Sequence, residues 1–206
     1  MKNLETPTTK LALYGALGSI GNALMVEALH RQYETTAILD DLNAITSRPG
    51  IRAKSGNLFE AVSVSQSVAG MDAVICVLAS DHLDTGASNA SAAGAERLSN
   101  AVTALLDGLV VAGVKRLLLI GDFNWMEHPS AVGEYIQQRL TGSPVAWTLV
   151  EAPEVADDLL QFDELTQPAR EPGGPVDVLQ RFAAGALDEL ELCLHVHCRL
   201  HLIDQQ

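Results

Sequence analysis

The chain alternates short apolar runs of strand character with longer amphipathic runs of helical character. The runs expected to form strands are residues 10–15, 35–39, 50–56, 71–80, 114–122, 144–154 and 192–203, and those expected to form helices are 19–32, 59–70, 95–112, 131–140 and 176–191. Strands that alternate with helices of roughly 10–15 residues bury their apolar surface in a parallel sheet covered on both faces. The pattern therefore predicts an α/β fold with a doubly wound, mostly parallel, Rossmann-like sheet.

Length and composition favour a single domain spanning residues 1–206. A chain of 206 residues with 48% hydrophobic content can build one sizeable core but is short for two domains. Residues 151–175 hold several prolines and seven acids, six of them between Glu151 and Glu164, and we interpret this segment as an irregular acidic loop or lid within the domain. A short helix–strand tail is expected after it.

Charge and cysteine usage exclude several classes of partner. The chain has 26 acidic and 13 basic side chains, a net charge of −13, whereas nucleic-acid and anionic-membrane binding need clustered lysine and arginine. No run of about 18 apolar residues occurs, and the N-terminus lacks an apolar signal segment. The three cysteines form no CxxC pair. We therefore expect a soluble cytoplasmic protein that binds neither nucleic acid nor membrane.

A glycine-rich turn, "YGALGSIG", follows the first expected strand and opens the first expected helix. Gly15 would form the tight turn, Gly18 would let a pyrophosphate approach the backbone amides, and Gly21 would let the helix pack on the strand. Asp40 stands nineteen positions after Gly21, where a carboxylate accepts hydrogen bonds from the adenosine ribose and repels a 2′-phosphate. The pattern predicts NAD(H) in preference to NADP(H). The alternatives are an ordinary strand–helix turn and a solvated acid.

Five stretches carry a resemblance to a known family: "LALYGALGSIGNALMVEAL", "AGMDAVICVLAS", "LLDGLVVAGVKRLLLIGD", "VAWTLVEAP" and "FAAGALDELE". Over nearly its whole length the chain resembles an atypical short-chain dehydrogenase/reductase, of the NAD(P)-binding group that includes NmrA-like proteins and NADH-flavin reductases. The resemblance implies the Rossmann fold and a bound dinucleotide.

The resemblance also implies which residues contact the cofactor. These are Gly15, Leu17, Gly18, Ser19, Ile20 and Gly21 at the pyrophosphate, Asp40 at the adenosine ribose, Asn57 and Leu58 at the adenine, and Ala79 and Ser80 at the nicotinamide ribose. The departures lie at the substrate end: Glu151 replaces the arginine of the family's "WT-x-x-R-P" signature, and "GDFNWMEHP" replaces a glycine- and serine-rich loop.

The Tyr-x-x-x-Lys dyad of ordinary short-chain dehydrogenases is absent from this sequence. Tyr135 has Arg139 four positions on, but arginine does not substitute freely for an ammonium, so we interpret the two as an ordinary amphipathic helix pair. Hydride transfer from a nicotinamide to a flavin or quinone needs no protein acid, so such acceptors suit the chain. The polar residues that could orient a substrate, or could simply be solvated, are Asp81, His82, Asp122, Asn124 and His128. No catalytic residue is assigned.

The histidine-rich C-terminus does not predict a metal site. In a strand, His195, His197 and His201 would share one face with Arg199, whose charge opposes a cation, so we expect an edge strand and no metal. No G-x-S-x-G elbow supports a serine hydrolase.

Two functions stay open, an NAD(P)H-dependent reductase of a small acceptor and a non-catalytic redox sensor or scaffold with a protein partner. A homo-oligomer is a further option, as is a degenerate member of the family that binds no nucleotide.

Overall fold

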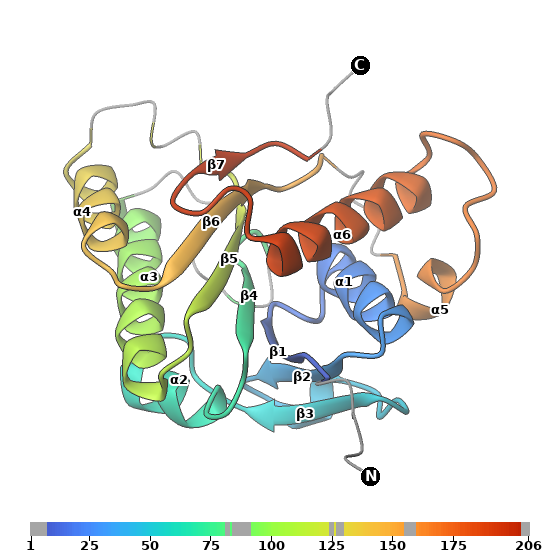
Figure 1. Ribbon diagram of the computed structural model, residues 1–206, viewed down its shortest axis with the longest axis horizontal. Helices are drawn as coiled ribbons and strands as arrows, with labels where there is room; N and C mark the ends of the chain where they lie inside the picture. The colour runs from blue at the N-terminus through green and yellow to red at the C-terminus, as the bar shows by residue number, and fades with distance from the viewer. Residues whose placement is uncertain are drawn as a thin grey trace, which may run out of the picture.

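The computed structural model describes residues 8–80, 83, 92–123, 126, 130–154 and 160–202. Its strands are β1 (Lys10–Tyr14), β2 (Glu34–Leu39), β3 (Ile51–Ser55), β4 (Ala73–Val77), β5 (Arg116–Gly121), β6 (Ala146–Glu151) and β7 (Arg199–Leu200). They form one seven-stranded sheet in the order β3-β2-β1-β4-β5-β6-β7, and every neighbouring pair is parallel (Figure 1).

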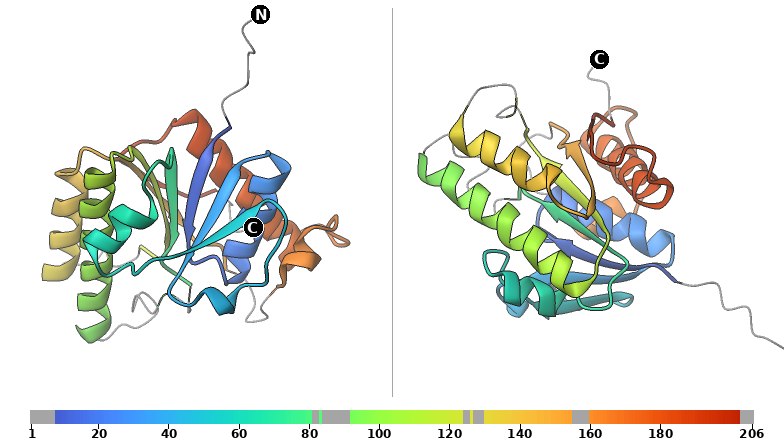
Figure 2. Two further views of the ribbon diagram at one scale, coloured as in Figure 1. Left: turned by 90° about the horizontal axis from the view of Figure 1, so that it is seen from below. Right: turned by 60° about the vertical axis from the view of Figure 1, so that its left-hand side comes forward.

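Helices cover both faces of this sheet. They are α1 (Ser19–His30), α2 (Ala61–Ser67), α3 (Ala92–Ala112), α4 (Ala131–Thr141), α5 (Phe162–Leu165) and α6 (Pro175–Leu192), with a short 3₁₀ turn, η1 (Leu42–Ala44). Helices α1, α5 and α6 pack on one face, and α2, α3 and α4 pack on the other (Figure 2). The predicted α/β, doubly wound fold is confirmed.

The central strands are apolar without a break because each one serves two cores. In β1, Leu11 and Leu13 pack on the α1 and α6 side, whereas Ala12 and Tyr14 pack on the α2 and α3 side. All residues of β4 and β5 are buried in the same way. A sheet covered on both faces requires this pattern.

The sheet has its topological switch point between β1 and β4. From β1 the chain proceeds through α1 to β2 on one side, and from β4 it proceeds through α3 to β5 on the other. The chain therefore continues in opposite directions along the sheet from the adjacent strands β1 and β4. Ligands of doubly wound folds bind at this position.

The prediction of a last strand over residues 192–203 is largely wrong. Only Arg199–Leu200 pairs with β6 as a strand, and residues 194–197 form a turn. Cys193 ends α6 with φ 51° and His197 has φ 61°, so both residues leave the extended region that side-chain alternation requires. The expectation that the three histidines share one strand face is therefore wrong.

The irregular segment 151–175 contains one turn of helix that was not expected. Gln161 and Glu164 form a capping box at the start of α5, in which Glu164 Oε2 accepts a hydrogen bond of 2.7 Å from the amide of Gln161. Phe162 and Leu165 are buried against the α1 and α6 core. This part of the loop is thus packed on the domain.

A buried polar network joins the start of β5 and β6 to the end of α6. Arg116 donates to the carbonyl of Ala146 (3.0 Å), to Thr148 Oγ1 (2.8 Å) and to Glu189 Oε1 (2.9 Å). His195 adds its backbone amide (3.0 Å) and its ring Nδ1 (2.8 Å) to the same carboxylate. Burial by itself would raise the pKa of Glu189, but the hydrogen bonds from His195 and the charge of Arg116 outweigh it and hold the pKa below its usual value.

Among the helices of the described ranges, none combines the length and the apolar composition that a membrane crossing needs.

Candidate functional site

Two of the three glycines in the first βα turn are required by the fold itself. Gly15 has φ +79°, and a β-carbon built on it would lie 2.8 Å from the carbonyl oxygen of Val77. A β-carbon on Gly21 would lie 2.2 Å from the carbonyl oxygen of Gly15. Both positions exclude side chains because backbone of the same protein occupies the space.

Gly18 is different, because nothing in the described part of the protein demands a glycine there. Its backbone is extended, with φ −84° and ψ 170°, and the nearest atom to a built β-carbon is Ser80 Oγ at 3.5 Å, an ordinary contact. The absence of a side chain at Gly18 therefore keeps backbone accessible from outside. This is what the close approach of a ligand phosphate needs.

Helix α1 begins at this turn without a side-chain cap. Its N-cap is Gly18, no side chain among the described residues bonds to the first-turn amides, and the first turn carries no acid. Neither Ser19 nor Asn22 caps the helix. Ser19 Oγ instead accepts a hydrogen bond of 2.9 Å from the amide of Leu160, and Asn22 Nδ2 donates one of 3.0 Å to its carbonyl. The positive end of the helix dipole is left for another group.

Ser80 supplies a second open polar group beside the turn. The residue is 7% exposed, and its hydroxyl has no hydrogen-bond partner among the residues that the structure describes. It lies against Gly15 and Gly18, next to the exposed Ala79. Buried hydroxyls are ordinarily paired, so an orphaned one facing a bare glycine backbone fits a missing ligand group. The donors present thus fit a dinucleotide phosphate and ribose.

A cavity of about 200 Å³ continues from the glycine turn along the end of β2. It is lined by Gly15, Ala16, Leu17, Ile38, Leu39, Asp40, Asp41, Ala44 and Leu83. Three of the predicted cofactor residues, Gly15, Leu17 and Asp40, therefore lie in one wall. The described lining contains no lysine or arginine that could pair with a 2′-phosphate.

The two acids at the end of β2 have separate roles. Asp41 caps η1, because its Oδ1 accepts a hydrogen bond of 2.9 Å from the amide of Asn43. Asp40 makes no hydrogen bond to the described residues around it, and its partial burial raises the pKa of its carboxyl. Asp40 is thus the carboxylate that stays available to a ligand in the cavity.

The residues predicted at the adenine are not among those that line this cavity. Asn57 is engaged locally, since its Oδ1 accepts from the amide of Phe59 (2.9 Å) and its Nδ2 donates to Glu60 Oε1 (3.0 Å). Leu58 is 2% exposed and belongs to the core. Ala44 and Leu83, which sequence reasoning missed, line the cavity instead. In the sequence, the only indication that Leu83 has a role is that it is an apolar residue among the polar residues of "DHLDTG".

The substrate end is described in part. Asp122 is exposed directly after β5, whereas Asp81, His82, Asn124 and His128 lie outside the described residues. Arg139 pairs with Asp107 of α3 and not with a tyrosine, and Tyr135 is 44% exposed.

Glu151, in the family's arginine position, forms an ion pair with Arg199 of β7. The Glu151 carboxylate of β6 is therefore paired with a guanidinium on the neighbouring strand β7. Within the described ranges, no group of three or more histidine, cysteine or acidic residues is arranged to hold a metal ion.

The fold and this site define a dinucleotide-binding α/β protein of the Rossmann type. A family model described as NAD(P)H-binding matches residues 15–166, well over half of the chain. The chain belongs to this NAD(P)H-binding family.

Solved structures share the fold at low sequence identity. A short-chain dehydrogenase/reductase from Veillonella parvula in complex with NADP matches with a TM-score of 0.63 and 10% identity, covering 95% of this chain and 94% of that one. A Rossmann-fold NAD(P)-binding family protein from Shigella flexneri gives 0.63 and 15%, covering 92% and 90%. A nucleoside-diphosphate-sugar epimerase from Staphylococcus aureus gives 0.65 and 15%, covering 94% and 70%.

Proposed function

We propose that this protein is an NADH-dependent reductase that passes hydride to a small acceptor such as a flavin or a quinone. The observation that carries the proposal is the pairing of Gly18 with Ser80. The fold does not need a glycine at position 18, and the buried hydroxyl beside it has no partner in the described structure. A ligand that touches bare backbone and brings a hydrogen-bonding group explains both features.

In this proposal each part of the site has one task. The amides at the start of α1 and the helix dipole stabilise the diphosphate, and Gly18 leaves room for it. The Ser80 hydroxyl bonds to the nicotinamide ribose, and the Asp40 carboxylate bonds to the adenosine ribose hydroxyls. The predicted contacts at Leu17, Ser19 and Ile20 would complete the cradle through their backbone.

The preference for NADH over NADPH rests on Asp40. A 2′-phosphate would meet this carboxylate, and none of the described residues around the cavity offers it a positive side chain. The Veillonella relative binds NADP, so the family fold by itself does not decide between the two cofactors. The local charge at the end of β2 favours NADH here.

The acceptor class follows from the residues available for proton transfer. The sequence holds no Tyr-x-x-x-Lys, and Arg139 beside Tyr135 is engaged by Asp107. When bound, the dihydronicotinamide supplies a hydride. The protein then needs only to position the acceptor and exclude water, which suits a flavin or quinone and disfavours an alcohol.

The experiment separates binding from turnover. NADH and NADPH are titrated by fluorescence against the wild type and Asp40→Ala, and NADH absorbance is then followed with FMN, riboflavin and a benzoquinone. We expect tighter NADH than NADPH binding, a larger loss for NADH in Asp40→Ala, and oxidation with at least one acceptor. Equal losses for the two cofactors would contradict the ribose role of Asp40, and no binding of either cofactor would overturn the proposal.

A redox sensor or scaffold that binds the dinucleotide without turnover is the second candidate. The observation that favours it is the Glu151–Arg199 ion pair, which engages the charged side chain at the family's arginine position. Tight NADH binding with no acceptor oxidised would select it, and a protein partner or self-association would then carry the signal. Cytoplasmic location remains part of both proposals.

A further inference from the structure

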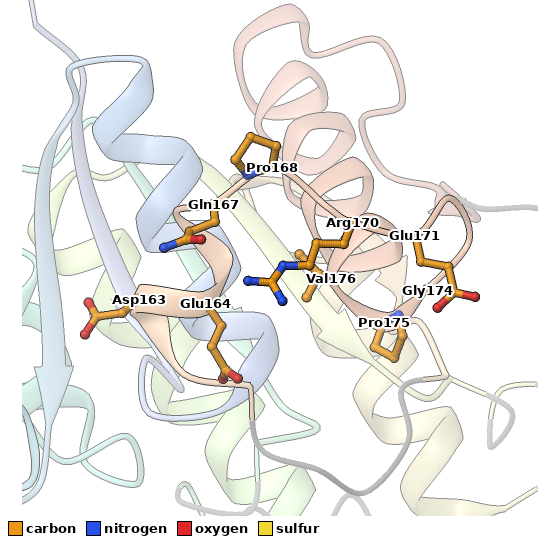
Figure 3. A pocket seen from close by; sticks show the side chains of 9 residues that line it. All are labelled: Asp163, Glu164, Gln167, Pro168, Arg170, Glu171, Gly174, Pro175 and Val176. Carbon is orange, nitrogen blue, oxygen red and sulfur yellow. The ribbon is translucent and has the colours of Figure 1, made fainter.

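A second, larger cavity lies outside the dinucleotide site. Its volume is about 520 Å³, within the usual range for small-molecule sites. It opens between α5, the loop that follows α5 and the first turn of α6 (Figure 3). Its lining residues are Asp163, Glu164, Gln167, Pro168, Arg170, Glu171, Gly174, Pro175 and Val176.

Arg170 is the residue that gives this cavity a binding function. Its guanidinium points into the space between α5 and the start of α6 (Figure 3). It forms no hydrogen bond or ion pair with any residue in the described part of the chain. An unengaged guanidinium presents a planar fork of donors that matches a carboxylate.

The acids nearest to α5 already have other partners. Asp163 pairs with Arg48 at 2.5 Å, and its side chain points away from the cavity in Figure 3. Glu164 caps the amide of Gln161 at 2.7 Å. Arg48 also lies over the Phe162 ring, with its guanidinium carbon 4.1 Å from the ring centroid, which fixes this side of the wall.

The walls are held in place without a ligand. Gln180 Nε2 donates to the carbonyls of Leu165 (2.9 Å) and Gln167 (2.7 Å), so α6 fixes both ends of the turn after α5. The amide of Gly173 donates to Asp177 Oδ2 at 2.9 Å, which fixes the approach to α6. A pre-formed wall lowers the ordering penalty that binding would otherwise carry.

We propose that this cavity binds a small organic monocarboxylate, with its carboxylate on the Arg170 fork and its apolar part on Val176 and the neighbouring prolines. The carboxylates of Glu164 and Glu171 and the net charge of −13 disfavour a polyanion such as a diphosphate. One guanidinium balances one carboxylate. The inference does not depend on dinucleotide binding, and its test omits NADH.

The test follows backbone amide shifts of the ¹⁵N-labelled full chain during titration with hexanoate. We expect saturable shifts that cluster at residues 163–176, and at least a tenfold loss of affinity in Arg170→Gln. Arg170→Lys should keep part of the affinity, because it retains the charge but loses the fork. The matched control is Arg52→Gln, which removes a 75% exposed arginine on β3 and should bind hexanoate as the wild type does.

Hexanamide and inorganic phosphate complete the experiment. Weak or no binding of both would support a carboxylate site with an apolar wall. Equal binding of hexanamide would show that Arg170 does not recognise the charge, and equal binding of phosphate would show a general anion site. Either result, unchanged hexanoate affinity in Arg170→Gln, or no saturable shift in the wild type would overturn the proposal. The spectrum of each variant reports directly whether it is folded.

Discussion

The two ends of the sheet differ in whether their buried polar groups are hydrogen-bonded within the protein. At the carboxyl ends of β1 and β4, α1 begins uncapped and the buried Ser80 hydroxyl has no partner in the described structure. At the opposite end, where β5 and β6 begin, Arg116 and Glu189 are buried in a network that bonds both charges several times. The comparison indicates that one end of the sheet stabilises the fold, whereas the other end keeps its bonding capacity for a ligand.

The largest expected effect is the removal of the Glu189 carboxylate. Glu189→Ala leaves the Arg116 charge buried without its partner, so the free energy of unfolding should fall by about 3–5 kcal/mol. Urea unfolding measures it. Asp188→Ala, at a side chain 61% exposed on the same helix, is the control and should change stability by less than about 1 kcal/mol. Similar losses of unfolding free energy in Glu189→Ala and Asp188→Ala would contradict the conclusion that the Arg116–Glu189 network stabilises the fold.

The same carboxylate should make stability depend on pH. Its pKa is lowered in the folded chain, so Glu189 stays charged when the unfolded chain takes up a proton near the ordinary value of 4.5. Its contribution is therefore complete above that value and is lost as pH falls further. Unfolding measured between about pH 5 and pH 3 should show a steeper loss for the wild type than for Glu189→Gln. Parallel curves would argue against the lowered pKa.

Gly21→Ala tests whether the glycine turn is also part of the fold. The new methyl would meet the Gly15 carbonyl, which cannot move without the strand, so we expect a loss of about 1–3 kcal/mol by thermal or urea unfolding. Gly185→Ala in α6 is the matched control. Its methyl would only touch Leu202 at 3.4 Å, and alanine is the better helix former, so stability should hold or rise.

Gly18→Ala should separate binding from stability. The fold accepts the methyl, so unfolding should change by less than about 1 kcal/mol. The methyl would project into the space left for the diphosphate, and NADH affinity should fall about tenfold or more, equivalent to roughly 1.4 kcal/mol. Fluorescence titration beside an unfolding curve gives both numbers. Wild-type affinity in this variant would remove the reason for a glycine at position 18.

Ser80→Ala is the smallest and most selective change. Removing an unpaired buried hydroxyl should leave the free protein equally stable or slightly more stable. Losing its bond to the cofactor should weaken NADH binding severalfold, by about 0.5–1.5 kcal/mol. A stability loss without an affinity loss would mean that the hydroxyl has an internal partner.

The sequence patterns correctly predicted those features of the fold that are determined by residues close together in the sequence. Unbroken apolar strands such as β4, and the glycines of the first turn, follow from local packing and backbone requirements. The contacts across the chain could not be predicted, because Ser19 bonds to a backbone group 141 positions away and Arg139 pairs with Asp107 on another helix. The C-terminal strand failed because alternation says nothing about residues such as Cys193 and His197 that adopt positive φ.

The two hydrogen bonds that α1 makes to Leu160 give the chain a built-in reporter. The Leu160 amide donates a hydrogen bond to Ser19, the residue directly after Gly18, although Leu160 belongs to a distant part of the sequence. A cofactor bound at this turn would stabilise the hydrogen bond from the Leu160 amide to Ser19, and so slow the exchange of that amide with solvent deuterium. One resonance far along the chain would thus report occupancy at its first loop, without any dye or label attached to the site.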